Sequence, residues 1–239
     1  MADDQFKGQP KRTIGLLVVV VLLIAALVPL TIYTVNYVNE LRTKALPTET
    51  PREIEVTNLT GTSATISWVT TSLQTVGYVK YGATNDLDEV AFDKRDAGEA
   101  SGEYTLHYVE LTNLVPNTTY YYAIIVGGTE YTRNGNPYDF QTGPILETVR
   151  TPVPIKGEVD DPTGGTEELI VFMYARKGSA ISNRVSVLTS NKRYTFDLTN
   201  LRTVDLSSAF TDFEDATITF FAEGAERGEG SLETKIMQL

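Results

Sequence analysis

The sequence predicts an all-β ectodomain of two tandem β-sandwiches, preceded by one N-terminal transmembrane α-helix. Three observations predict this: an uncharged apolar run near the N-terminus, period-two alternation of apolar and polar residues after residue 50, and turn-forming residues between the short alternating stretches. We divide the chain into a short cytoplasmic tail (1–13), the transmembrane helix (14–38), a linker (39–50), a first sandwich (51–142), a Pro-rich linker (143–154) and a second sandwich (155–239).

Composition already excludes several classes of function. The chain has 239 residues, 20 Lys and Arg against 31 Asp and Glu, a formal net charge of −11, no Cys and one His. An acidic surplus repels phosphate backbones, so we expect no nucleic-acid partner. Without Cys there are no disulfides, thiolate metal sites or Cys nucleophiles, and His107 alone cannot supply a His-rich metal site. We therefore expect no metal, no cofactor and no catalytic residues.

The apolar run from Ile14 to Tyr33 has twenty residues and no charge. At about 1.5 Å per residue it spans roughly 30 Å, the thickness of a bilayer's hydrocarbon core. Tyr33 and Tyr37 fall where aromatic side chains settle at a membrane interface. The run therefore predicts an uncleaved anchor in the lipid bilayer. A cleavable signal peptide and a pilin-type leader with Gly8 at its cleavage site are the alternatives.

Orientation depends on the part of the chain beyond the helix, because basic residues flank the apolar run almost equally on both sides. A short N-terminal tail inside and a large β-rich part outside is the usual arrangement of a signal anchor. We therefore expect a single-pass protein of the cell membrane, with a cytoplasmic N-terminus and extracellular C-terminal domains.

The first sandwich is predicted from seven short alternating stretches separated by turn signals. Ile54 and Val56 alternate with polar residues in the first stretch, and Ile66 and Trp68 do so in the second. The expected strands are 53–59, 64–70, 76–81, 89–93, 104–111, 118–126 and 137–142.

A specific motif leads into the sixth stretch, where Leu114, Pro116, Thr118 and Tyr120 form a Leu-x-Pro-x-Thr-x-Tyr pattern. It resembles the tyrosine corner of fibronectin type III domains, whose tyrosine hydroxyl bonds to backbone where the chain crosses between sheets. Trp68 matches the core tryptophan of that family. The whole stretch also resembles the domain that precedes the catalytic domain of purple acid phosphatases, through 66–70, 79–82 and 107–111.

The resemblance to purple acid phosphatases does not lead us to expect enzymatic activity. A dinuclear metallophosphatase site needs several His and carboxylate ligands on a large α/β domain, whereas this chain has one His and continues as β structure. We interpret His107 as a strand residue near the sandwich surface. A hydrolase remnant with weak phosphoesterase chemistry is kept as a remote alternative.

Strand alternation also predicts a possible docking face. If Tyr120, Tyr122 and Ile124 point into the core, the residues between them point outward. With the outward positions of the neighbouring strand they form a partly aromatic surface that could anchor a partner. This docking face comprises Tyr78, Lys80, Tyr121 and Ile125. The alternative is that a loop or the neighbouring domain covers it.

Period-two alternation returns after the Pro-rich linker and predicts the second sandwich. The expected strands are 155–159, 169–175, 184–188, 194–198, 217–222 and 232–237. The series 157–160, 164–165, 170–174, 186–189 and 194–198 is similar to carboxypeptidase-regulatory-like, transthyretin-type sandwiches. That family usually has a Gly before its Tyr-x-Phe strand, where this chain has Ser190 to Arg193.

Two acidic clusters are the nearest approach to a site for a hard cation. They comprise Asp160 and Asp161, and Asp212, Glu214 and Asp215. Calcium needs six to eight converging oxygens, usually from a loop of fixed register, and neither cluster has one. We interpret both as solvated turns.

The complete pattern resembles surface proteins of small-genome bacteria that carry one membrane helix, a fibronectin type III domain and a further sandwich. It implies a non-enzymatic surface protein that displays β-sandwiches for adhesion, scaffolding or binding of an extracellular protein or glycan. The alternative is a structural or accessory subunit of a membrane-bound or filamentous envelope assembly.

Overall fold

The computed structural model is all-β in the part of the chain that it describes. The described residues are 49–70, 74–96, 102–147, 151–159, 168–189, 191–211, 213, 215–224 and 229–235. The predicted transmembrane helix, 14–38, lies outside them. Within the described residues, no helix has the length and apolar character needed to cross a membrane.

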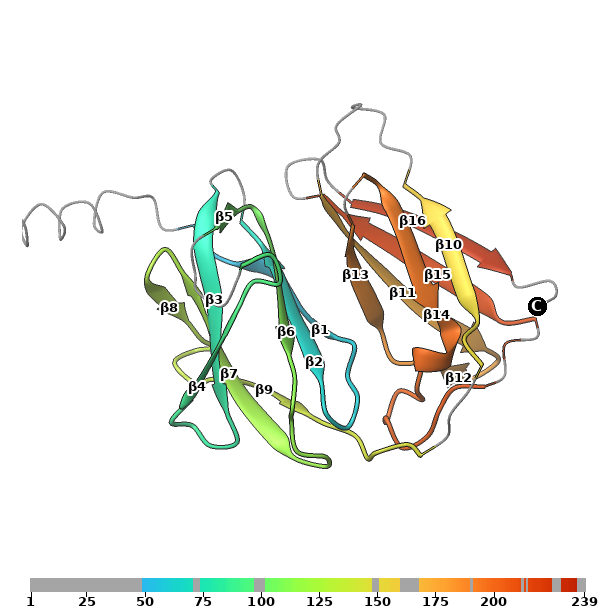
Figure 1. Ribbon diagram of the computed structural model, residues 1–239, viewed down its shortest axis with the longest axis horizontal. Coiled ribbons are helices and arrows are strands. Elements are labelled where there is room, and N and C mark those ends of the chain that lie inside the picture. Colours follow the sequence, from blue (N-terminus) through green and yellow to red (C-terminus); the bar gives the residue numbers. More distant parts are fainter. Residues whose placement is uncertain are drawn as a thin grey trace, which may run out of the picture. The chain divides into compact units, whose positions relative to one another are not determined.

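The first sandwich consists of two antiparallel sheets, and Figure 1 labels their strands. One sheet has the order β1-β2-β6, with β1 Arg52–Thr57, β2 Ala64–Val69 and β6 Leu106–Leu111. The other has the order β4-β3-β7-β8, and β5 and β9 pair with β3 and β7. Its strands are β3 Thr75–Gly82, β4 Glu89–Phe92, β5 Glu103–Tyr104, β7 Thr119–Val126, β8 Thr129–Tyr131 and β9 Tyr138–Gln141.

Alternating side chains of the two sheets form the core of the first sandwich. Ile66 and Trp68 on β2 lie in one buried cluster with Tyr120, Tyr122 and Ile124 on β7. The inward positions predicted for β7 are confirmed by this cluster. The fold follows from the alternation itself, because period-two side chains on paired strands share one face.

The second sandwich combines a five-stranded sheet with a two-stranded sheet. The larger sheet has the order β12-β11-β15-β16, with β13 paired to β11, and the smaller sheet pairs β10 with β14. Its strands are β10 Pro154–Glu158, β11 Leu169–Lys177, β12 Ala180–Ile181, β13 Val185–Thr189, β14 Arg193–Asp197, β15 Thr217–Glu223 and β16 Glu229–Lys235.

An irregular segment completes the second core after the predicted strand 194–198, whose last residue, Leu198, begins a short helix. After β14 the chain forms a short 3-10 helix, η1 (Leu198–Asn200), whose first turn is capped by Asp197 accepting a hydrogen bond from the backbone N–H of Thr199. Leu198, Leu201 and Phe210 then pack into the same buried cluster as the strands. Leu198 continues the alternation of Tyr194 and Phe196, whereas Leu201 and Phe210 follow no period and their burial is not readable from alternation.

Two short strands, β8 and β12, were not predicted, and each pairs with the preceding strand through a turn that contains glycine. Gly127 and Gly128 both have positive φ, and they join β7 to β8 as a two-residue hairpin connection. Gly178, also at positive φ, joins β11 to β12. The last strand begins three residues earlier than predicted, at Glu229 in place of Leu232.

Candidate functional site

The motif residues of the first sandwich lie around the start of β7. The hydroxyl of Tyr120 accepts a hydrogen bond from the backbone N–H of Val115 at 3.0 Å, and the Thr118 hydroxyl donates to the Pro116 carbonyl at 3.1 Å. Leu114 is buried in the core. This is the geometry of a tyrosine corner, and it fixes the loop before β7 without offering any reactive group to solvent.

The predicted docking face lies on the outer side of β3 and β7. Tyr78, Lys80 and Tyr121 are half-buried, and Lys80 forms a surface ion pair with Glu130 at 3.3 Å. Ile125 is only 3% exposed, so the expectation that it is accessible was wrong. Ile125 is paired with Tyr78 on β3 and with Glu130 on β8. Because both neighbouring side chains lie against it, its own side chain is shielded from solvent. A docking role for the other three stays a prediction.

His107 lies in the core and not near the surface, which corrects the sequence interpretation. Its side chain is 0% exposed, and its ring stacks on Trp68 with 4.6 Å between centroids and 7° between planes. Trp68 and His107 are direct cross-strand partners in the β2–β6 ladder, so they share the inner face. Thr75 contacts His107 Nε2 at 3.1 Å. Burial lowers the pKa of His107 to about 4.

This lowered pKa predicts a loss of stability in mild acid. The unfolded chain binds a proton near pH 6.5 and the folded chain only near pH 4, so the stabilisation is complete above about pH 6.5 and is lost as the pH falls toward 4. When the pH is lowered from 7 to 5, we expect the protonation equilibrium of His107 to reduce the free energy of unfolding by about 2 kcal/mol. Chemical denaturation at both pH values measures it. His107→Gln should show a correspondingly smaller decline, and an equal decline in both proteins would contradict the assignment.

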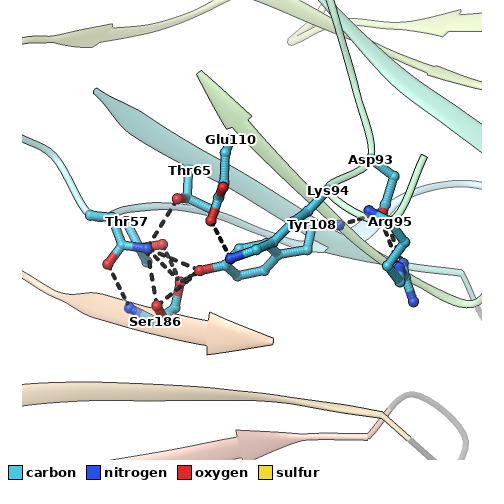
Figure 2. A network of polar contacts seen from close by, with 9 residues as sticks. Thr57, Thr65, Asp93, Lys94, Arg95, Tyr108, Glu110 and Ser186 are labelled. Carbon is cyan, nitrogen blue, oxygen red and sulfur yellow. Dashed lines mark hydrogen bonds and ion pairs between the residues drawn. The ribbon is translucent and has the colours of Figure 1, made fainter. Parts of the chain in front are cut away.

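The strongest candidate for a functional feature is the polar network between the two sandwiches, shown in Figure 2. Ser186 on β13 donates its backbone N–H to Asn58 Oδ1 at 2.9 Å, and its carbonyl accepts from Tyr108 Oη at 2.9 Å. Asn58 Nδ2 lies 3.0 Å from the Ser186 carbonyl, Tyr108 Oη and Thr65 Oγ1. Thr57 and Ser186 join their hydroxyls at 2.6 Å. Polar groups buried here are paired across the boundary, which fixes the register of the two sandwiches.

Asn58 hydrogen-bonds the backbone edge of β13 as a neighbouring strand would. Its carboxamide takes both backbone groups of Ser186, and its own backbone N–H donates to the Arg184 carbonyl at 3.1 Å. Asn58 has φ 52°, a left-handed conformation that Asn tolerates better than most residues. The turn after β1 thereby covers part of an edge strand that would otherwise present unpaired groups.

An apolar cluster surrounds this network. Tyr108 is 1% exposed, and it packs with buried residues of both sandwiches. The cluster comprises Val69, Leu106, Tyr108, Ile170 and Phe172, with Leu188 and Phe221 partly buried against it. The contact therefore has the composition of a core and not of a wet encounter surface, and residues 48–239 behave as one compact unit.

A charged cluster flanks the same contact. Asp93 is 1% exposed and accepts from Arg95 Nε at 2.7 Å, from Arg95 Nη2 at 2.8 Å and from the backbone N–H of Tyr108 at 2.8 Å. Arg95 also pairs with Glu168, which immediately precedes β11, and its guanidinium stacks on Tyr104 at 3.4 Å. Burial opposes the charge of Arg95, but the hydrogen bonds that Arg95 donates to Asp93, with the negative charges of Asp93 and Glu168, outweigh it and raise the pKa of Arg95. This network is structural, since each charge faces a partner.

A groove of about 690 Å³ lies beside the polar network, between β6 and the β13–β14 segment. Its walls include the ion pair of Lys94 with Glu110, at 2.7 Å, and the side chains of Arg193, Thr195 and Asn200. The hydrogen bond that Lys94 donates to Glu110 is the main cause that raises the pKa of Lys94. The lining is rich in hydroxyl and amide groups, so the groove suits a polar ligand.

Within the described residues, no group of three or more His, Cys, Asp and Glu side chains is placed to hold a metal ion. Asp160, Asp161, Asp212 and Glu214 lie outside the described residues. Asp215 is described, with φ 57° in the turn before β15.

The residues of the interface were not predicted, although one signal was available. Every residue of β2 is buried, and on β6 Leu106 and Tyr108 are buried as well as His107 and Val109. Val69, Leu106 and Tyr108 stand at positions that alternation assigns to solvent. Apolar residues on both faces of a strand indicate a sheet that is covered on both sides.

Comparison with known proteins supports the description of the first sandwich. The family model described as the purple acid phosphatase N-terminal domain matches residues 51–142. Residues 51–142 form a fibronectin type III-like β-sandwich. The match ends before the second sandwich, whose likeness to transthyretin-type domains stays a prediction. No curated protein matches the chain.

Several solved structures are similar to parts of the chain. A computer-redesigned β-sandwich protein is 31% identical, and the match covers 40% of this chain and 96% of that one, with a TM-score of 0.25. The FN1–FN3 domains of chicken CNTN1 are 15% identical, with 77% and 64% covered and a TM-score of 0.25. A two-domain fibronectin type III segment of chicken tenascin is 14% identical, with 78% and 99% covered and a TM-score of 0.22.

Proposed function

We propose that this protein is a non-enzymatic, single-pass membrane protein that displays its two sandwiches at the cell surface for adhesion, scaffolding or binding of a protein or glycan. The observation that carries the proposal is the buried contact built around Tyr108 and Ser186, which joins two β-sandwiches in one compact unit. Domains held together by a buried contact lose less conformational entropy when they present one surface to a partner. Fibronectin type III-like domains are compatible with such an interaction role.

The non-enzymatic part of the proposal is supported by the surroundings of the groups that could do chemistry. His107 is enclosed in the core, and burial lowers its pKa to about 4. The buried carboxylate of Asp93 is fully engaged by Arg95 and the Tyr108 backbone. Release of p-nitrophenol from its phosphate ester with added divalent metal, abolished in His107→Ala, would contradict this part.

The membrane part of the proposal is supported by the uncharged run from Ile14 to Tyr33. Protease shaving of intact cells tests both anchor and orientation. We expect residues 49–239 to be digested from outside while the protein sediments with membranes. Protection of these residues would contradict the orientation, and recovery of the chain from the soluble fraction without its first forty residues would contradict the anchor.

A second candidate function is a subunit of an envelope assembly, and the edge of the second sandwich favours it. β16 is the last strand of its sheet, and Leu232 on it is 57% exposed. Exposed apolar edge strands are sites where another chain can add. Cross-linking in the native membrane should give a ladder for such a subunit and a single band for a solitary anchor.

A further inference from the structure

On the edge of β13, the backbone groups of Leu188 are available for hydrogen bonding, whereas those of Ser186 are already bonded to the first sandwich. In an antiparallel pair, the residues whose N–H and C=O point away from the partner strand recur at every second position. Ser186 is such a residue, because both its backbone groups bond to side chains of the first sandwich. Leu188 is two positions further along the same ladder, opposite Ile170, so its N–H and C=O also point away from β11. Neither group has a partner among the residues that the structure describes.

This open position lies in the wall of the 690 Å³ groove. Asn58 lines the same groove and shows which groups this strand edge can bind. Its side-chain amide has the same donor and acceptor as a peptide group, and it bonds the N–H and the C=O of Ser186 together. A peptide bond placed one step along the edge meets the same pair of groups on Leu188. The side chain of Leu188 packs into the interface cluster, so the edge at this position is held in place.

We propose that this groove binds a short extended peptide of a partner protein, whose main chain pairs with the N–H and C=O of Leu188 as an added β-strand. The proposal rests on the proposed function and names its partner class. Strand addition gives affinity through main-chain hydrogen bonds and specificity through alternate side chains. Those side chains would meet Thr195 and Asn200 on one wall and the Lys94–Glu110 pair on the other.

The groove favours a peptide over a glycan because of which groups face it. Its aromatic members are not available as platforms for a sugar ring. Tyr108 is buried in the interface, and the ring of Tyr194 packs on Phe196 and Phe220 at 5.7 and 5.3 Å between centroids. What remains open is a strand edge with hydroxyl, amide and charged side chains around it, which matches the donors and acceptors of an extended main chain.

The test uses the full-length chain in lipid nanodiscs and a library of random short peptides. A selected peptide is then resynthesised with a single N-methyl group at each position in turn. We expect one position, the residue that pairs with Leu188, to lose about tenfold or more in affinity, because one main-chain hydrogen bond is removed, while its immediate neighbours change little. Thr195→Trp, at an exposed position in the groove wall, should abolish binding. Thr129→Trp, at an exposed position on β8 outside the groove, is the matched control and should bind as the parent does.

The proposal would be overturned by selection of no peptide, by a selected peptide that still binds Thr195→Trp of native thermal stability, or by an affinity that no N-methyl group alters. Binding of a glycan array in place of peptides, blocked by Thr195→Trp, would assign the groove to the other ligand class and overturn it as well. Failure here is distinct from failure of the proposed function, because protease shaving and sedimentation report the display of the sandwiches whatever the groove binds.

Discussion

Replacing Tyr108 by Ala is expected to cost about 3–5 kcal/mol of unfolding free energy and to separate the unfolding of the two sandwiches. The ring is 1% exposed at the centre of the apolar cluster, and its hydroxyl donates to the Ser186 carbonyl at 2.9 Å. The variant thus creates a cavity and leaves the Ser186 carbonyl short of a partner in a buried contact. Without this contact each sandwich retains its own core, and we expect the two cores to unfold in separate steps.

Trp68 makes the separation measurable, since it is the single tryptophan and lies in the first core. Its fluorescence follows the first sandwich during chemical denaturation, while far-UV circular dichroism follows both. The two transitions should coincide in the parent protein and diverge in Tyr108→Ala. Tyr108→Phe keeps the ring, so it should cost only about 1–2 kcal/mol. Tyr121→Ala, half-buried on the outer face of β7, is the control, and equal losses in Tyr121→Ala and Tyr108→Ala would contradict the interface role.

The strands were largely predictable because alternation is a local property. The inward positions of β7, Tyr120, Tyr122 and Ile124, follow from the position of the corner tyrosine alone. The segment that follows β14 was not predictable in this way. Leu201 and Phe210 fill the second core from irregular backbone, where no period relates one buried residue to the next.

The candidate site was not predictable from the sequence for a related reason. Asn58 and Ser186 are 128 residues apart, and each reads locally as an ordinary polar residue of a turn or a strand. Their pairing exists only once two separately folded faces meet. His107 is a different case. It lies on the inner face beside Trp68, whereas the contact covers Leu106 and Tyr108 on the opposite face of β6. Because both faces of this strand carry buried residues, its apolar pattern does not show which face is inward.

Replacing Gly77 by Ala is expected to cost about 3 kcal/mol, at the upper end of the usual penalty for overpacking a core. A Cβ built at Gly77 on β3 would lie 2.6 Å from the His107 ring and 2.8 Å from Trp68 Cζ2. These rings are rigid, buried and stacked on each other at 4.6 Å, so neither can yield without breaking the stack. The added methyl group therefore forces β3 away from β2 and β6. Chemical denaturation measures the loss, and a shift in Trp68 fluorescence of the folded protein should accompany it.

Gly230→Ala is the matched control for this substitution, because Gly230 is also a strand glycine. A Cβ there meets nothing within 4 Å, and its φ is not in the left-handed region. Ala at such a position reduces the entropy of the unfolded chain, so we expect no loss and a gain of up to about 1 kcal/mol. A methyl group has room above the exposed Gly230 on the edge strand β16 and none above the buried Gly77. If Gly77→Ala were as stable as Gly230→Ala, the stacked rings would have to be mobile, and the enclosure that lowers the pKa of His107 would fall with them.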